Sequence, residues 1–296
     1  MRENAIITKD LKKAYGKQDA VNGLNLSVPK GSVYGFLGKN GAGKTTTIKM
    51  LLGLLSAKSG DIDVLGFNPK NEKEAVEIRK RTGYVSENQK MYDNMKIKEI
   101  ISFTKSFYKT WDDKAAAELL KRFNLDEKKK LSELSRGMYA QVALLLALAF
   151  KPELLVLDEP TGSLDAIVRR DFLESVVGMI QEEGRTVFFS SHQINEVERV
   201  ADWVGIIDRG KLLISAPIDD LKTKTKRIRA VYKDNAPDVS FDGMLCKKTE
   251  GRELLAIAGD FNDTVLSGIK KGKPENVEVY DMNLEEIFVA YAGGKI

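Results

Sequence analysis

Short apolar stretches alternate with turn residues along the first part of the chain. Residues 24–28 alternate between apolar and polar side chains, and residues 29–32 are typical of a turn. Residues 33–37 then form a short apolar run that leads into a glycine-rich loop. From residue 44 to about residue 55, apolar side chains recur at helical spacing. The pattern therefore predicts a strand, a glycine-rich loop and a helix in direct succession.

The middle of the chain, about residues 86–150, changes to helical spacing. Short runs of Val, Ile, Leu or Phe return at residues 154–157, 187–190 and 204–207, with helical segments between them. Such alternation is typical of parallel strands covered by helices on both faces. We predict an α/β domain over residues 1–222, with a helical subdomain of about residues 86–150 inserted into it.

The pattern changes again after about residue 222. Residues 228–232, 244–248 and 254–257 are typical of short strands. Asn283 and Glu286 form a capping box that opens a terminal helix. We predict a small α+β accessory domain over residues 223–296. The basic run at residues 222–229 is interpreted as a solvated linker.

Composition narrows the possible partners of the chain. Its 47 basic and 43 acidic residues give a net charge of +4, and the basic residues are scattered, so nucleic acid is not an expected partner. Cys246 is the single cysteine, which excludes an intrachain disulfide and fits a reducing compartment. The longest apolar run, residues 142–150, is far shorter than the ~20 residues of a membrane-spanning helix. We therefore expect any membrane association to come through a partner.

The glycine-rich loop matches the phosphate-binding pattern and lies between a predicted strand and a predicted helix. Its glycines let backbone N–H groups surround a phosphate, and the helix N-terminus favours negative charge. Lys44 is expected to bridge the β- and γ-phosphates of ATP, while the Thr45 hydroxyl ligates Mg²⁺. The expected nucleotide-binding residues of this loop are Gly38, Lys39, Asn40, Gly41, Ala42, Gly43, Lys44, Thr45 and Thr46.

Two acidic residues and one histidine follow later apolar strands. Asp158 and Glu159 come directly after residues 154–157, and His192 follows residues 187–191. Because parallel strands bring their carboxyl ends to one edge, these side chains are expected beside the phosphate loop. Asp158 would hold magnesium through a water molecule, and Glu159 would orient and deprotonate the attacking water. His192, the only histidine in the chain, is expected to contact the γ-phosphate.

These residues, in this order, resemble the ATP-binding subunits of ABC transporters. The resemblance covers about residues 4–220, and its most specific motif is the signature sequence at residues 134–138. It implies that Ser135 and Gly137 complete the ATP site of a second subunit, a role that suits an N-capping serine at a helix start. It also implies that Tyr15 stacks on adenine, and that Ser163, Leu164 and Asp165 cross a dimer interface.

Two departures from the family pattern refine the resemblance. Arg136 and Met138 replace the commoner Gly and Gln of the signature. Together with residues 108–112 and 283–288, they are similar to the branch of antibiotic-resistance and type 2 exporters. Glu87 stands where the family has a glutamine that contacts magnesium, with Gln89 two residues later. Either residue would serve this loop, and Glu87 is the one we expect at the metal.

One phosphate loop and one signature do not make a complete site within one chain. We therefore expect a two-fold dimer, either of two identical chains or with a paralogous ATPase, which drives separate polytopic permease subunits. The chain would lie in the cytoplasm, on the inner face of the cell membrane. A soluble ABC ATPase acting on ribosomes or DNA would carry a second ATPase domain or a long coiled coil, and neither is present. A small-molecule kinase or GTPase leaves the signature unexplained.

Overall fold

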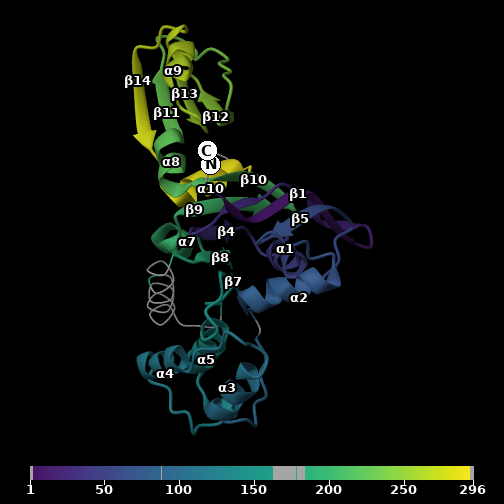
Figure 1. Cartoon of the computed structure of the whole chain (residues 1–296). Coiled ribbons are helices and arrows are strands. Elements are labelled where there is room, and N and C mark those ends of the chain that lie inside the picture. The colour runs from purple at the N-terminus through teal and green to yellow at the C-terminus, as the bar shows by residue number, and fades with distance from the viewer. Residues whose placement is uncertain (1–2, 88, 163–177, 179–183, 294–296) are drawn as a thin grey trace. The chain divides into compact units, whose positions relative to one another are not determined.

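The computed structural model describes residues 3–87, 89–162, 178 and 184–293 (Figure 1). The chain divides into two compact units. The first comprises Met1–Ala201 and Ile207–Leu212, and the second comprises Asp202–Ile206 and Leu213–Ile296. Within the described residues, no helix combines the length and the apolar character that crossing a membrane requires.

The first unit begins with an antiparallel sheet in which β1 is the central strand. β1 pairs with each of the other three strands. In the alternating stretch of residues 24–28, the apolar side chains of Leu24, Leu26 and Val28 are all fully buried. The strands are β1 (Asn4–Tyr15), β2 (Gln18–Leu24), β3 (Ser27–Pro29) and β5 (Ser59–Val64).

The second layer of this unit holds four parallel strands in the order β4, β8, β7, β6. Every residue of β4, β7 and β8 is buried, as expected for strands covered on both faces. The strands are β4 (Val33–Leu37), β6 (Thr82–Val85), β7 (Leu154–Asp158) and β8 (Thr186–Ser191). β9 (Trp203–Asp208) and β10 (Lys211–Pro217) follow along the chain. The predicted α/β class is confirmed.

The helices of the first unit include those predicted from apolar spacing. The helix after the glycine-rich loop ends at Leu51 rather than at about residue 55, because Gly53 adopts φ 65° and the Leu54 N–H bonds back to the Lys49 carbonyl. The helices are α1 (Lys44–Leu51), α2 (Glu72–Arg81), α3 (Ile97–Lys105), α4 (Asp113–Arg122), the 3₁₀ turn η1 (Leu131–Glu133), α5 (Arg136–Leu148) and α7 (Ile194–Val200).

The second unit contains a four-stranded antiparallel sheet in the order β12, β13, β11, β14, with α9 on one face (Figure 1). Ile228 and Ala230 of β11 and Ile269 of α9 are fully buried between sheet and helix. The strands are β11 (Lys226–Val231), β12 (Met244–Glu250), β13 (Glu253–Ala258) and β14 (Asn276–Asp281). The helices are α8 (Ile218–Lys224), α9 (Asp263–Lys270) and α10 (Leu284–Tyr291).

Two predictions about this unit had different outcomes. The capping box at Asn283 and Glu286 is present at the start of α10, so that prediction is confirmed. The interpretation of residues 222–229 as a solvated linker is wrong, because α8 ends and β11 begins within this run. In β11, Arg229 pairs with Glu253 and Glu278 of the sheet, and Arg227 pairs with Glu286 of α10. The run therefore joins the end of a helix to a strand, and within β11 Arg227 and Arg229 lie on the face opposite the buried Ile228 and Ala230.

Candidate functional site

The glycine-rich loop runs from the end of β4 to the start of α1, as predicted. Its backbone leaves no room for side chains at two positions. A Cβ at Gly38 would lie 2.5 Å from the Ile207 carbonyl oxygen, and one at Gly43, whose φ is 108°, would lie 2.4 Å from the Ala20 carbonyl oxygen. Gly41 also adopts a positive φ of 79°. Glycine is required for this compact turn, which leaves the first N–H groups of α1 available to an anion.

Lys44, the first residue of α1, is buried within the loop that precedes it. Its ammonium donates hydrogen bonds to the carbonyls of Gly38, at 2.6 Å, and Lys39, at 3.2 Å. It also lies 3.1 Å from Glu159 Oε1, and the two side chains are 6% and 7% exposed. Glu159 Oε1 accepts no hydrogen bond within the described part of the chain. A buried ion pair with an unused acceptor is expensive to maintain and marks a candidate functional site.

The side chains of Thr45, at the start of α1, and Asp158, the last residue of β7, are in direct contact. The Thr45 hydroxyl donates to Asp158 Oδ1 at 3.1 Å, and the Ser190 hydroxyl donates to the same oxygen at 2.7 Å. Asp158 is 1% exposed. A hydroxyl and a carboxylate oxygen are hard ligands of the kind that Mg²⁺ prefers. The chemistry of this pair therefore fits a magnesium ion.

Glu159 follows β7 in a left-handed backbone conformation, with φ 48°. Its N–H donates to the Ser190 hydroxyl at 3.0 Å, and its Oε2 lies 2.8 Å from His192 Nδ1. His192 follows β8, and its side chain is 41% exposed. The carboxylate of Glu159 is thus held between a lysine of the phosphate loop and a solvent-facing histidine. This arrangement can orient a water molecule and accept its proton.

A cavity of about 370 Å³ lies at the mouth of the loop, in the volume range of small-molecule sites. Tyr15 lies at its edge with 54% of its surface exposed, an orientation that suits stacking. Glu87 also lines the cavity, whereas Gln89 is turned away and accepts hydrogen bonds from the Ser86 N–H and hydroxyl. The lining residues are Tyr15, Gln18, Ala20, Asn40, Gly41, Gly43, Lys44, Thr45, Thr46, Glu87 and Glu159.

Ser135 and Gly137 do not line this cavity. They lie at the start of α5, where the Ser135 hydroxyl caps the helix by accepting from the Met138 N–H at 3.3 Å. Ser163, Leu164 and Asp165, the predicted crossing loop, lie outside the described residues. Within the described chain, the structure therefore gathers the phosphate loop, Asp158, Glu159, Glu87, His192 and Tyr15, and leaves the signature residues separate.

Three further residues support the site without having been singled out in the sequence. Ser190 holds Asp158 and Glu159 as described above, and its position directly before the Ser191-His192 pair was the available signal. Thr161 is 1% exposed and hydrogen-bonded to Glu196. Tyr84 of β6 has its pKa raised to about 12, chiefly by burial and secondly by the charge of Asp158. Tyr84 therefore stays neutral beside that carboxylate near neutral pH.

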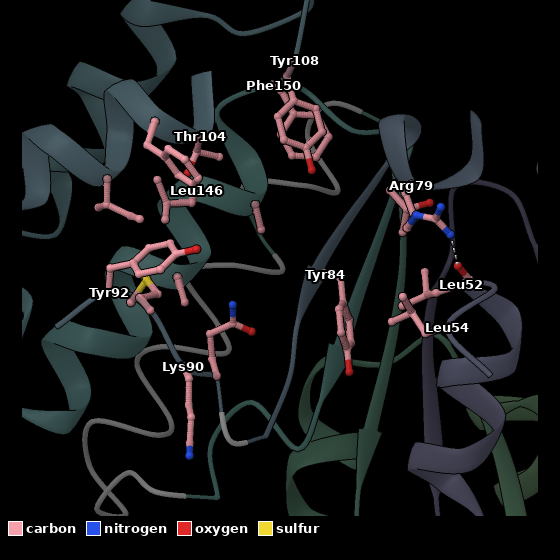
Figure 2. A pocket seen from close by; sticks show the side chains of 17 residues that line it. Leu52, Leu54, Arg79, Tyr84, Lys90, Tyr92, Thr104, Tyr108, Leu146 and Phe150 are labelled. Atoms are coloured by element: carbon pink, nitrogen blue, oxygen red, sulfur yellow. Dashed lines mark hydrogen bonds between the residues drawn. The ribbon is translucent and has the colours of Figure 1, made fainter. Parts of the chain in front are cut away.

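A second cavity, of about 350 Å³, lies in the same unit (Figure 2). Tyr92 and Leu146 approach it from the helical side, and Tyr84 and Leu54 face it from the sheet side. Tyr108 and Phe150 stack at its end with ring centroids 3.9 Å apart (Figure 2). Leu54, Tyr92 and Phe103 are 52%, 60% and 40% exposed, so the rim of this cavity is unusually apolar for a surface.

Known proteins are similar to this chain over most of its length. The family model described as ABC transporter matches residues 21–162. The bacitracin transport ATP-binding protein BcrA of Bacillus licheniformis is 41% identical over 225 residues, which are 75% of this chain and 72% of the relative. The uncharacterized ABC transporter ATP-binding protein YhaQ of Bacillus subtilis is 33% identical over 294 residues, which cover 95% and 96% of the two chains.

Solved structures share the same fold. One ATP-binding subunit of an ABC transporter has a TM-score of 0.66 at 25% identity, over 74% of this chain and 92% of that chain. A dimeric ATP-binding cassette bound to ADP and phosphate has a TM-score of 0.65 at 21% identity, over 72% and 98%. The predicted resemblance is confirmed: the chain belongs to the ATP-binding proteins of ABC transporters and is the ATP-hydrolysing motor subunit of such a transporter.

Proposed function

We propose that this chain hydrolyses magnesium-bound ATP with Glu159 as the base that takes the proton of the attacking water. The observation that carries the proposal is the buried Glu159 carboxylate, held 3.1 Å from Lys44 and 2.8 Å from His192. When ATP binds, the Lys44 ammonium turns to the β- and γ-phosphates, and the exchange leaves Glu159 free to face the water. His192 remains beside Glu159 and contacts the γ-phosphate.

Magnesium would be held by Thr45 and Asp158, with Glu87 at the open side of the cavity. The ion neutralises charge on the phosphates, which is the chemistry that it supplies here. A glutamate in place of glutamine adds a full negative charge, and a unit-charge pair ~6 Å apart contributes roughly 3 kcal/mol at an effective dielectric near 20. Glu87 is exposed, so solvent screening reduces this value. The charge attracts Mg²⁺ and repels the bare triphosphate.

The role of Glu87 is tested by titrating ATP affinity against magnesium. Wild type should depend more steeply on magnesium than Glu87→Gln, because removal of the charge relieves repulsion when magnesium is scarce. Gln89→Ala is the matched control, since Gln89 bonds to Ser86 and does not line the nucleotide cavity. If Glu87→Gln left the magnesium dependence of ATP affinity unchanged while Gln89→Ala weakened ATP binding, Gln89 and not Glu87 would be the residue of this loop that contacts magnesium.

A complete hydrolysis site would need two chains, identical or paralogous, related by a two-fold axis. Ser135 and Gly137 lie apart from the chain's own nucleotide cavity, at a helix start that can receive an anion from a partner. One solved relative of the fold is a dimeric cassette bound to ADP and phosphate. We assign the ATPase domain to residues 1–222, its helical subdomain to about 86–150, and an accessory domain to residues 223–296.

The dimer is tested with Glu159→Gln, which should retain ATP because turnover is slowed. Size exclusion with light scattering should give a dimer with magnesium and ATP, and a monomer without nucleotide. Gly137→Asp in the same background adds negative charge at the start of α5, so it should abolish the dimer while each chain still binds ATP. A dimer that persists with Gly137→Asp would exclude the signature from the interface.

The membrane subunits would dock at the apolar cavity of Figure 2. Its exposed Leu54, Tyr92 and Phe103 favour an apolar segment of a polytopic permease, and the helical subdomain would transmit closure to it. The chain would then lie in the cytoplasm, on the inner face of the cell membrane. Relatives are named for bacitracin transport and linearmycin resistance, which favours an exporter of antimicrobial compounds. Tyr92→Asp should abolish co-purification with the permease and leave ATP affinity unchanged.

A further inference from the structure

Glu196 of α7 joins the ends of two neighbouring strands. It is 8% exposed, and both of its carboxylate oxygens accept hydrogen bonds. The Thr161 hydroxyl donates to Oε1 at 2.6 Å, and the Ser191 hydroxyl donates to Oε2 at 2.5 Å. Thr161 lies just beyond β7, two residues after Glu159, while Ser191 ends β8 and precedes His192. One carboxylate therefore bridges the segments that carry Glu159 and His192.

The position of this carboxylate is fixed by close packing of α7 on β4. A Cβ at Gly35 would lie only 2.4 Å from Val197 Cγ1, so the helix approaches the strand as closely as a glycine allows. Val197, next to Glu196, is fully buried. Because the helix cannot shift toward or away from the strand without loss of packing, Glu196 acts as a rigid support.

The segment that Glu196 holds is under backbone constraint. Glu159 has φ 48°, a conformation that residues with a side chain rarely adopt and that persists only where the surroundings fix it. Before this residue, the chain is held by Ser190, which bonds both Asp158 and the Glu159 N–H. After it, the Thr161–Glu196 bond holds the chain. Glu159 is thus fixed from both sides.

We infer that Glu196 is a positioning residue for ATP hydrolysis, which keeps Glu159 and His192 at their 2.8 Å separation by holding the chain beyond each of them. Glu196 does not line the nucleotide cavity. The inference rests on the proposed roles of Glu159 and His192. Removal of the bridge should therefore lower turnover while nucleotide affinity, which depends on the phosphate loop, is retained.

The direct test is Glu196→Gln in the full chain. A glutamine side chain has one acceptor oxygen and an NH₂ group that only donates, so one hydroxyl must accept instead of donate, and both lose their bonds to a charged carboxylate. We expect kcat to fall about tenfold while the KM for ATP and the Kd of a fluorescent ADP analogue stay within about twofold, the signature of a group that matters only in the transition state. A kcat within twofold of wild type, or an equal loss of affinity and turnover, would overturn the inference.

Thr161 supplies a matched pair that separates the bridge from other contacts of Glu196. Thr161→Val removes the hydroxyl at constant shape and should reproduce the loss of kcat, whereas Thr161→Ser keeps the hydroxyl and should restore it. The double variant Thr161→Val with Glu196→Gln should be no slower than the slower single variant, because both substitutions act on the same bridge. Additive losses would contradict the bridge. If Glu196→Gln fails to fold, equal rates for Thr161→Val and Thr161→Ser would still contradict it.

Glu159→Gln distinguishes this inference from the proposed function. If Glu159→Gln hydrolysed ATP at the wild-type rate, Glu159 would not be the base, and both the proposed function and the inference that rests on it would be wrong. Strong dependence on Glu159 combined with a fully active Glu196→Gln would overturn the positioning role alone.

Discussion

The two units of this chain use charged side chains in opposite ways. In the first unit, Lys44 and Glu159 face one another with 6% and 7% of their side chains exposed, and Glu159 Oε1 accepts no hydrogen bond from the described residues. In the second unit, Arg229 pairs with Glu253 and Glu278, and these side chains are 39%, 36% and 38% exposed. Desolvated charge is costly and is typical of functional sites, whereas exposed pairs on a sheet make only a small contribution to stability.

The two units also differ in backbone conformation, with rarely adopted φ angles at the nucleotide site of the first unit. Around the nucleotide site, Glu159 holds a left-handed φ of 48°, and Gly43 reaches φ 108°. In the second unit, residues 226–231 and 253–258 pair in an uninterrupted antiparallel register. In the first unit these left-handed conformations lie at the nucleotide site, whereas the central strand pair of the second unit is regular. The comparison predicts that matched substitutions in the two units will have very different effects.

The largest effect is expected for Glu159→Gln. Loss of the base should lower kcat by about 10²–10⁴-fold while ATP still binds. Phosphate release under saturating ATP measures this directly. Glu253→Gln is the matched control, because Glu253 belongs to an exposed ion pair in the second unit. If Glu159→Gln turned over at the wild-type rate, the buried carboxylate would have no catalytic role.

Lys44→Ala should weaken nucleotide binding, since a charged hydrogen bond to phosphate is lost. Such bonds contribute about 1.5–3 kcal/mol, which corresponds to roughly ten- to a hundredfold in Kd. Equilibrium binding of ATP with magnesium gives the value. Lys226→Ala, which removes an ion pair with Asp281 in the second unit, should leave the Kd unchanged. Equal Kd values for both variants would contradict the contrast between the units.

Ile228→Ala should destabilise the second unit and spare the first. Ile228 is fully buried against α9, and truncation of a buried isoleucine costs about 2–5 kcal/mol. Hydrogen exchange of residues 226–281 should accelerate, while ATP affinity and turnover remain at wild-type levels. Val279→Ala, a position that is 40% exposed in the same sheet, serves as the mild control. A parallel loss of ATP binding would show that the two units do not fold independently.

The smallest effect is expected for Arg229→Met. Its hydrogen bond lowers the pKa of Glu253, and the Tyr280 hydroxyl and then Arg229 lower that of Glu278. Carboxylates with a lowered pKa stabilise the fold above their ordinary pKa near 4.5, and this stabilisation is lost as pH falls. The thermal unfolding midpoint of Arg229→Met should therefore be slightly lower than that of wild type at pH 7 in low salt. The difference from wild type should vanish in acid or at high salt, and its persistence there would indicate a packing role for the side chain.

Local signals in the sequence determined a large part of the fold. The loop at residues 38–45 predicted a strand before it and a helix after it, and β4 and α1 are found there. The capping box at Asn283 predicted the start of α10. These features depend on near neighbours, namely glycine conformations, caps and apolar periodicity, which a single sequence displays. The interpretation of residues 222–229 as a linker was wrong because charge alone does not distinguish a linker from a helix end followed by a strand with exposed basic residues.

The tertiary structure alone decided which side chains meet. The sequence predicted Asp158 and Glu159 at the edge of the sheet and offered Glu87 and Gln89 as alternatives, and in the structure Glu87 lines the nucleotide cavity. Thr45 and Asp158 are 113 positions apart, and Glu196 shows no motif of its own. Contacts of this kind depend on the strand order β4, β8, β7, which long connections permit in several arrangements. The sequence shows which side chains lie on each strand, but only the packing of the whole sheet determines which strands are adjacent.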